Sequence, residues 1–142
     1  MLARTGLDPQ EALVCTMVLV AAADTGGITD REIGVMATLV QTLPIFEGFS
    51  GDQLRRAADA AVGLLREEEG LAHAGRLIRD SLSGRLRETA YDLACEVVAA
   101  DLTHAQATLR MLEFIGGELR LDPLVMAAIE RGTKARYQRV DS

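Results

Sequence analysis

The sequence predicts an all-α protein that forms a single globular domain. Its 142 residues suit one domain. Hydrophobic residues make up 49% of the chain and are mostly aliphatic, with no Trp and 3 Pro, which favours close-packed helices. Apolar residues recur at helical spacing, helix-capping patterns precede several apolar segments, and no segment shows the pattern of a β-hairpin.

The first helix is predicted to begin at Asp8 and to run to about Ala23. Asp8 supplies an N-cap carboxylate, and Pro9 occupies the first helical position, where its missing N–H costs nothing. Residues 12–23 are almost entirely apolar on every side of a helix, so we expect this helix to be the central and most buried one. The segment 24–27, which contains two glycines, ends it.

Two capping boxes are predicted to open the next two helices. Thr29 and Glu32 have the spacing at which each side chain satisfies a backbone donor of the other residue. The helix behind them ends at Pro44. Residues 50–53 repeat the capping pattern and begin a third helix that carries an apolar stripe to about Leu65.

The second half of the chain is expected to contain four more helices. They cover residues 71–82, 86–100, 103–117 or slightly beyond, and 122 onward. Gly70 breaks the chain after three glutamates. Residues 103–106 form a third capping pattern, and Asp122 followed by Pro123 repeats the chemistry seen at residue 8.

An internal repeat links the two halves. Residues 20–24 match residues 97–101 at four of five positions, and each copy follows an apolar helix and precedes a helix capped by Thr. A helix–turn–helix unit of this kind cannot bury its apolar face alone, whereas two copies can pack together. The sequence therefore predicts two pseudo-symmetric halves, about 8–66 and 71–138.

These segments resemble the tellurite-resistance TerB family. The first half carries Ala-Ala-Asp at 22–24 and Gly-x-Ile-Thr-x-x-Glu at 26–32. The second half is similar to the family over residues 86–122, with Gln106 where the family pattern has Glu. The resemblance spans about residues 8–136.

The resemblance implies fold and context. It implies an all-helical fold of about seven helices with pseudo-twofold symmetry, and it names no reaction. It also implies a divalent-cation site built from acidic residues of the two turns, and an association with tellurite and stress-response systems.

The expected metal ligands are Asp24, Glu32 and Asp101. Asp24 and Asp101 lie where their helices end, and a helix dipole disfavours an anion there. Each Asp could instead accept hydrogen bonds from the backbone of its own turn, and Glu32 is also explained as the capping partner of Thr29. Both interpretations stay open at this stage.

Two other charged groups have structural interpretations. Glu88, Asp92 and Glu96 recur every four residues and are predicted to form a solvated face, with an acidic groove for a basic helix or a metal as the alternative. Four cations near the C-terminus are first interpreted as helix-end stabilisers. They are Arg131, Lys134, Arg136 and Arg139.

Composition excludes several classes of function. The formal net charge of −6 and pI of about 4.9 argue against a nucleic-acid partner. No signal-peptide core or membrane-spanning segment is present, so we expect a cytoplasmic protein. Cys15 and Cys95 are expected to be buried hydrophobes, and His73 and His104 are isolated from any catalytic pattern.

The sequence thus favours a non-enzymatic TerB-like module, a scaffold or regulatory binding protein with a weak divalent-cation site. Its partner would be another protein or a second copy of the chain. The alternative is a metal-free, helix-based protein–protein interaction domain that forms a homodimer. A hydrolytic enzyme is the least supported class, because it needs a pocket with a perturbed acid–base pair.

Overall fold

The structure is a computed structural model that describes residues 6–100 and 106–141, and the regular secondary structure of these residues is helical, with no strand. The all-α prediction is therefore confirmed. The elements are α1 (Pro9–Ala21), α2 (Asp30–Thr42), the short 3-10 helix η1 (Pro44–Phe46), α3 (Gly51–Leu65), α4 (Gly70–Ser81), α5 (Gly84–Ala100), α6 (Gln106–Leu119) and α7 (Pro123–Arg136).

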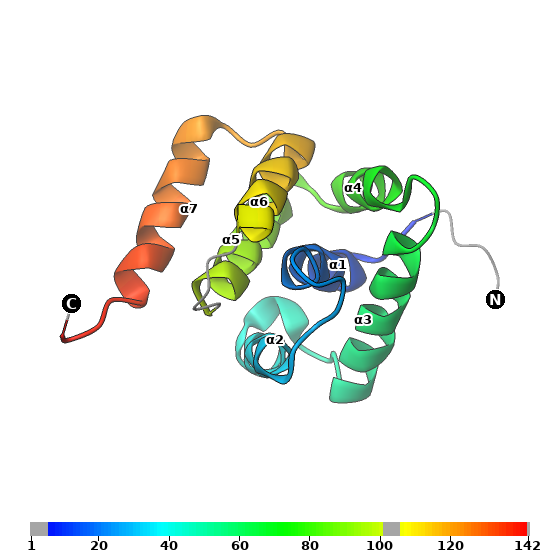
Figure 1. Cartoon of the computed structure of the whole chain (residues 1–142), viewed down its shortest axis with the longest axis horizontal. Helices are drawn as coiled ribbons and strands as arrows, with labels where there is room; N and C mark the ends of the chain where they lie inside the picture. The colour runs from blue at the N-terminus through cyan, green and yellow to red at the C-terminus, as the bar shows by residue number, and fades with distance from the viewer. Residues whose placement is uncertain (1–5, 101–105, 142) are drawn as a thin grey trace.

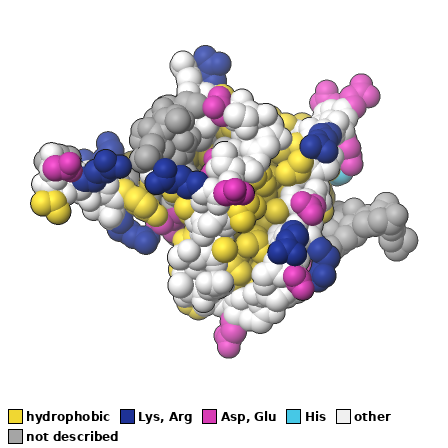
Figure 2. Space-filling model, turned by 60° about the horizontal axis from the view of Figure 1, so that its bottom comes forward, with side chains coloured by type: hydrophobic (Ala, Val, Ile, Leu, Met, Phe, Trp, Pro, Cys, Tyr) yellow, Lys and Arg dark blue, Asp and Glu magenta, His cyan; other side chains and the backbone are white. Residues whose placement is uncertain are grey.

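Helix α1 lies in the middle of the molecule, with α2, α3, α4, α5 and α6 packed around it (Figure 1). Helix α7 lies at one edge and packs against α5. The side formed by α2 and α3 carries a continuous area of hydrophobic side chains bordered by charged ones (Figure 2). In the part of the chain that the structure describes, no helix is long and apolar enough to cross a membrane.

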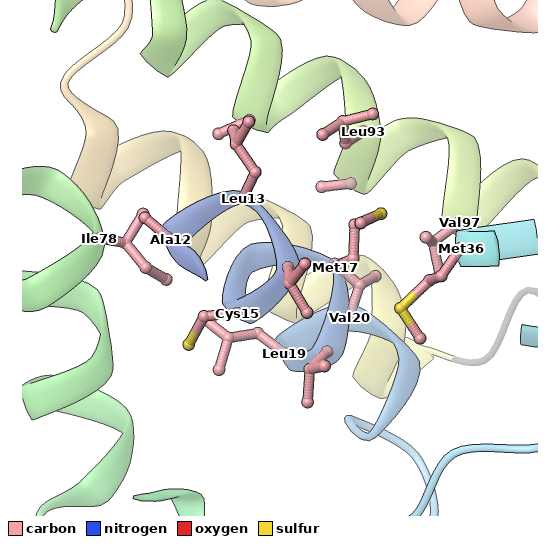
Figure 3. Close-up of a cluster of buried hydrophobic side chains, with 14 of the residues drawn as sticks. Ala12, Leu13, Cys15, Met17, Leu19, Val20, Met36, Ile78, Leu93 and Val97 are labelled. Carbon is pink, nitrogen blue, oxygen red and sulfur yellow. The ribbon is translucent and has the colours of Figure 1, made fainter. Parts of the chain in front are cut away.

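The core is built on α1, as the sequence predicts. Every residue from Ala12 to Ala21 is buried. The hydroxyl of Thr16, a polar group among them, donates a hydrogen bond to the Ala12 carbonyl oxygen at 2.8 Å. In Figure 3, Ile78 of α4 and Leu93 of α5 are among the side chains gathered around α1. The two apolar helices of the predicted repeat, α1 and α5, pack directly on each other, and the relation between the two halves stays a prediction.

Four predicted helix starts are confirmed, at α1, α2, α3 and α7, whereas α4 and α5 begin one and two residues earlier than expected, at Gly70 and Gly84. The side chains of Asp8, Thr29, Ser50 and Asp122 each accept a hydrogen bond from a backbone N–H in the first turn of their helix. Asp8 also forms a full capping box with Glu11, whose carboxylate accepts from the Asp8 N–H at 3.0 Å. The expected capping pattern at 103–106 falls largely on residues outside the described ranges.

One local expectation is confirmed with an added detail, and another needs correction. Pro44 ends α2, but it also begins η1, which buries Phe46 against Phe49 with ring centroids 5.6 Å apart. Gly70 is not the break between two helices, because residues 66–69 connect α3 to α4. It is buried and begins α4, and a Cβ at this position would collide with the Leu64 carbonyl oxygen. Glycine is needed here because α4 starts in direct contact with the end of α3.

Candidate functional site

A groove lies between α2, α5, α6 and α7. It encloses about 880 Å³, within the range of small-molecule sites. Four aliphatic side chains line it: Val35 from α2, Val98 from α5, and Leu109 and Leu112 from α6. Helices from both halves of the chain therefore contribute to the same surface.

Local sequence explains why the groove is open and apolar. Leu109 and Leu112 are three residues apart on α6, so they share one face of that helix. The last turn of α5 ends in Ala99 and Ala100, which also line the groove. Because alanine side chains are short, they leave space beside α7 that larger residues would fill.

Charged side chains from two helices line the groove. They are Arg31 in the first turn of α2, and Glu130 and Lys134 in α7, and Arg139 follows that helix. Within residues 6–100 and 106–141, neither Arg31 nor Lys134 forms an ion pair. These two cations outnumber the one carboxylate, Glu130, on a chain whose net charge is −6.

Glu130 is held by a buried tyrosine. The Tyr91 hydroxyl donates a hydrogen bond to the Glu130 carboxylate, and this contact ties α5 to α7. Burial, together with the bond to Glu130, raises the pKa of the Tyr91 phenol above its ordinary value. The phenol therefore stays protonated and keeps donating at neutral pH.

A second polar contact between α5 and α7 lies beside the groove. Glu96 is only 1% exposed, and its two carboxylate oxygens have separate partners. Arg136 Nη1 lies 2.6 Å from Oε2, and the Tyr137 hydroxyl donates to Oε1 at 2.9 Å. A buried carboxylate with both oxygens bonded satisfies the requirement for charge inside a protein.

This contact corrects the prediction of a solvated acidic face. Glu88 is exposed as expected, but Asp92 is half-buried and Glu96 is buried. Burial, reinforced by the nearby charge of Glu96, raises the pKa of Asp92. The expectation failed because α7 packs over this face, and the spacing of residues within α5 carries no sign of that.

One sequence signal could have revealed the buried carboxylate. Glu96 stands in an otherwise apolar run, Leu93 to Val98, and every residue of that run is buried. A glutamate is almost never fully buried unless it is paired. Its position in an apolar run therefore predicts a cation from elsewhere in the chain beside it. Arg136 is that cation. It lies in the last turn of α7, where the prediction of a helix-end role also applies.

Both cysteines are buried and free, as predicted. Burial raises the pKa of Cys15 and that of Cys95 to about 12 in each case. Cys95 lines the groove, but its thiol is protonated at neutral pH and is therefore a poor nucleophile.

The predicted cation ligands are only partly in view. Asp24 is exposed in the turn after α1, and Asp101 lies outside the described residues, as does His104. Glu32 is the capping partner of Thr29, since its Oε1 accepts from the Thr29 N–H at 2.8 Å and from the hydroxyl at 3.0 Å. Residues 6–100 and 106–141 hold no group of three His, Cys, Asp or Glu side chains placed to bind a metal. Because Asp101 belongs to the expected site, that site stays a prediction.

Comparison with protein-family models, with characterised proteins and with solved structures gives no significant match for this chain. The resemblance to the TerB family accordingly stays a prediction from the sequence motifs.

Proposed function

We propose that this chain is a non-enzymatic helical binding module whose ligand occupies the groove between α2, α5, α6 and α7. The observation that carries the proposal is the groove itself, which holds about 880 Å³ between aliphatic side chains. Filling such a surface removes apolar area from water, and that is the main favourable contribution to binding.

The polar groups around the groove favour binding over catalysis. Glu130 accepts the Tyr91 hydrogen bond, and Tyr137 donates to Glu96, so both stabilise the packing of α7 on α5. Cys95 is protonated at neutral pH because its pKa is raised to about 12. A hydrolytic mechanism needs a nucleophile next to a base, and these groups have structural roles instead.

The TerB resemblance supplies a cellular context for the module. Under this proposal the protein acts as a scaffold or regulatory component in a tellurite or stress response. A weak divalent-cation site at Asp24, Glu32 and Asp101 would accompany the groove. The support for this part is the motif pattern at residues 22–32 and 86–122.

A neutral apolar fluorophore tests the binding function. N-phenyl-1-naphthylamine brightens when it enters an apolar site, and we expect saturable enhancement with the unmodified chain. Leu109, which is 45% exposed and lines the groove, is changed to Glu, and the enhancement should be lost. Leu124→Glu is the matched control, because Leu124 is 80% exposed and lies outside the groove.

Two results would contradict the proposal. One is the absence of enhancement with the unmodified chain. The other is equal enhancement with Leu109→Glu and Leu124→Glu, since the dye would then be bound elsewhere.

The alternative function is a metal-free interaction domain that forms a homodimer. The observation that favours it is the hydrophobic area on the α2 and α3 side (Figure 2), because large exposed apolar patches often mark protein–protein contacts. Val62 on α3 is half-buried and belongs to the partly buried hydrophobic shell of the core. Sedimentation velocity over a range of concentrations tests this alternative. A dimer that Val62→Glu dissociates and Leu109→Glu leaves intact would support it, and a monomer at every concentration would reject it.

A further inference from the structure

We propose that the ligand of the groove is a single-chain amphiphile with an anionic headgroup, such as a fatty-acid carboxylate. Its chain would lie against the aliphatic walls, and its headgroup would lie between Arg31 and Lys134. This inference rests on the proposed binding function and adds the chemical class of the ligand.

The charges of the groove select an anion. Arg31 and Lys134 come from two different helices, α2 and α7, and line the same cavity. The single described carboxylate that lines it, Glu130, is hydrogen-bonded to Tyr91. Low-dielectric walls concentrate the field of such cations, so a negative headgroup gains more here than at an open surface.

The groove differs in charge from the chain as a whole. The chain has 15 Lys and Arg against 21 Asp and Glu, so its overall charge of −6 disfavours anions. An anion would therefore be guided to the cationic groove and away from the remaining surface.

The walls require an apolar body behind the headgroup. Val35, Val98 and Leu112 offer no hydrogen bonds to a small polar ion such as inorganic phosphate. They do favour methylene groups, each of which strengthens binding by up to about fourfold when it leaves water. An acyl chain is the simplest body that combines this chemistry with one negative end.

Competition with the bound fluorophore tests the charge preference. Dodecanoate and dodecyltrimethylammonium have chains of similar length and opposite headgroup charge, and both are used below their micelle-forming concentrations. We expect dodecanoate to displace N-phenyl-1-naphthylamine at a concentration at least tenfold lower. Decanoate should displace it less effectively than dodecanoate, because two methylene groups are missing.

Charge-removing variants locate the headgroup. Arg31→Gln combined with Lys134→Gln should raise the half-displacement concentration of dodecanoate by about fivefold to tenfold, the range for two exposed ionic contacts. The affinity of each variant for the neutral fluorophore is measured directly, and the half-displacement concentrations are compared after correction for it. The control is Arg56→Gln combined with Arg66→Gln, which changes the net charge equally at two exposed positions outside the groove and should have no effect.

The outcomes separate this inference from the proposed function. If the fluorophore binds but the two amphiphiles compete equally, or both double variants behave alike, the anionic ligand is rejected and the binding module stands. If the fluorophore does not bind, the proposed function fails as well. Co-sedimentation with phosphatidylglycerol vesicles, without displacement by dodecanoate, would overturn the proposal in favour of a membrane surface as the partner.

Discussion

The Glu96 carboxylate and the Arg136 guanidinium meet at 2.6 Å although 40 residues separate them in the chain. The pair is unequal, because the Glu96 side chain is buried whereas that of Arg136 is 63% exposed. Solvent screens the arginine, so the attraction of the pair adds little stability by itself. Its larger role is to satisfy a carboxylate that the packing of α7 on α5 removes from water.

Removal of Arg136 should therefore cost more than the loss of a surface arginine. We expect Arg136→Ala to lower the free energy of unfolding by about 1–3 kcal/mol, because the buried carboxylate loses its charged donor. Glu96→Gln should cost less, since a neutral amide needs no cation. Urea unfolding measures both changes, with Arg131→Ala on the exposed surface of α7 as the control. Equal effects of Arg136→Ala and Arg131→Ala would show that Glu96 does not depend on this cation.

Stability should fall at alkaline pH. The pKa of Tyr91 is raised from 10.0, and those of Cys15 and Cys95 are raised from 9.0 to about 12. The unfolded chain releases these protons at lower pH than the folded chain does. The free energy of unfolding is therefore unaffected below about pH 9 and decreases as pH rises beyond it.

Urea unfolding between pH 7 and 11 measures this decline, and Tyr91→Phe should make it shallower above about pH 10. Thr89→Val, a change two residues from Tyr91 that removes no titrating group, is the control and should keep the full slope. An identical slope for Tyr91→Phe and the unmodified chain would show that the phenol does not contribute.

The two thiols should be nearly unreactive in the folded protein. Cys15 and Cys95 are buried and protonated at neutral pH, so a disulfide reagent such as Ellman's reagent should react slowly at pH 8. In urea both should react quickly, because unfolding exposes them and restores their ordinary pKa. Rapid reaction of one thiol under native conditions would contradict the burial of that residue.

Two glycines near the α3–α4 junction should respond to alanine in opposite directions. Gly70→Ala would push a methyl group against the Leu64 carbonyl, and we expect a loss of about 1–3 kcal/mol. Gly63 lies within α3 with open space around its Cβ position, so Gly63→Ala should stabilise the protein by about 0.5–1 kcal/mol. Thermal unfolding of the two variants decides this, and a shift in the same direction would contradict the packing at Gly70.

The divalent-cation prediction has a direct test. Chelator-treated protein is melted with and without Ca²⁺, Mg²⁺, Mn²⁺ or Zn²⁺. An ion at one hundred times its dissociation constant should add about 2.7 kcal/mol to the free energy of unfolding. Asp24→Asn and Asp101→Asn should each remove the gain, whereas Asp59→Asn on exposed α3 should keep it. No gain with any of the four ions would leave the two aspartates as turn residues.

The helices were predictable because their signals are local. Asp8, Thr29, Ser50 and Asp122 each bond to the first turn of the helix that follows, so three or four neighbouring residues are enough to locate those starts. The burial of α1 was equally predictable from the sequence, since a helix that is apolar on all sides is stable only when other helices pack around it.

The candidate groove could not be predicted from short-range sequence patterns. Its walls come from α2, α5, α6 and α7, and no short stretch of sequence states that these helices meet. The expected cation ligands came instead from a motif resemblance, and Glu32 of that set has a capping role.

The sequence by itself determined the all-helical class, the starts of the four helices with capping side chains at Asp8, Thr29, Ser50 and Asp122, and the choice of α1 as the central helix. These properties depend on backbone capping and on hydrophobic periodicity, which act over a few residues. Only the tertiary structure decided that Glu96 is buried, that Arg136 neutralises it, and that a cationic groove opens beside them. Those features require α7 to pack on α5, and such packing depends on the shapes and charges of surfaces that lie far apart in the chain.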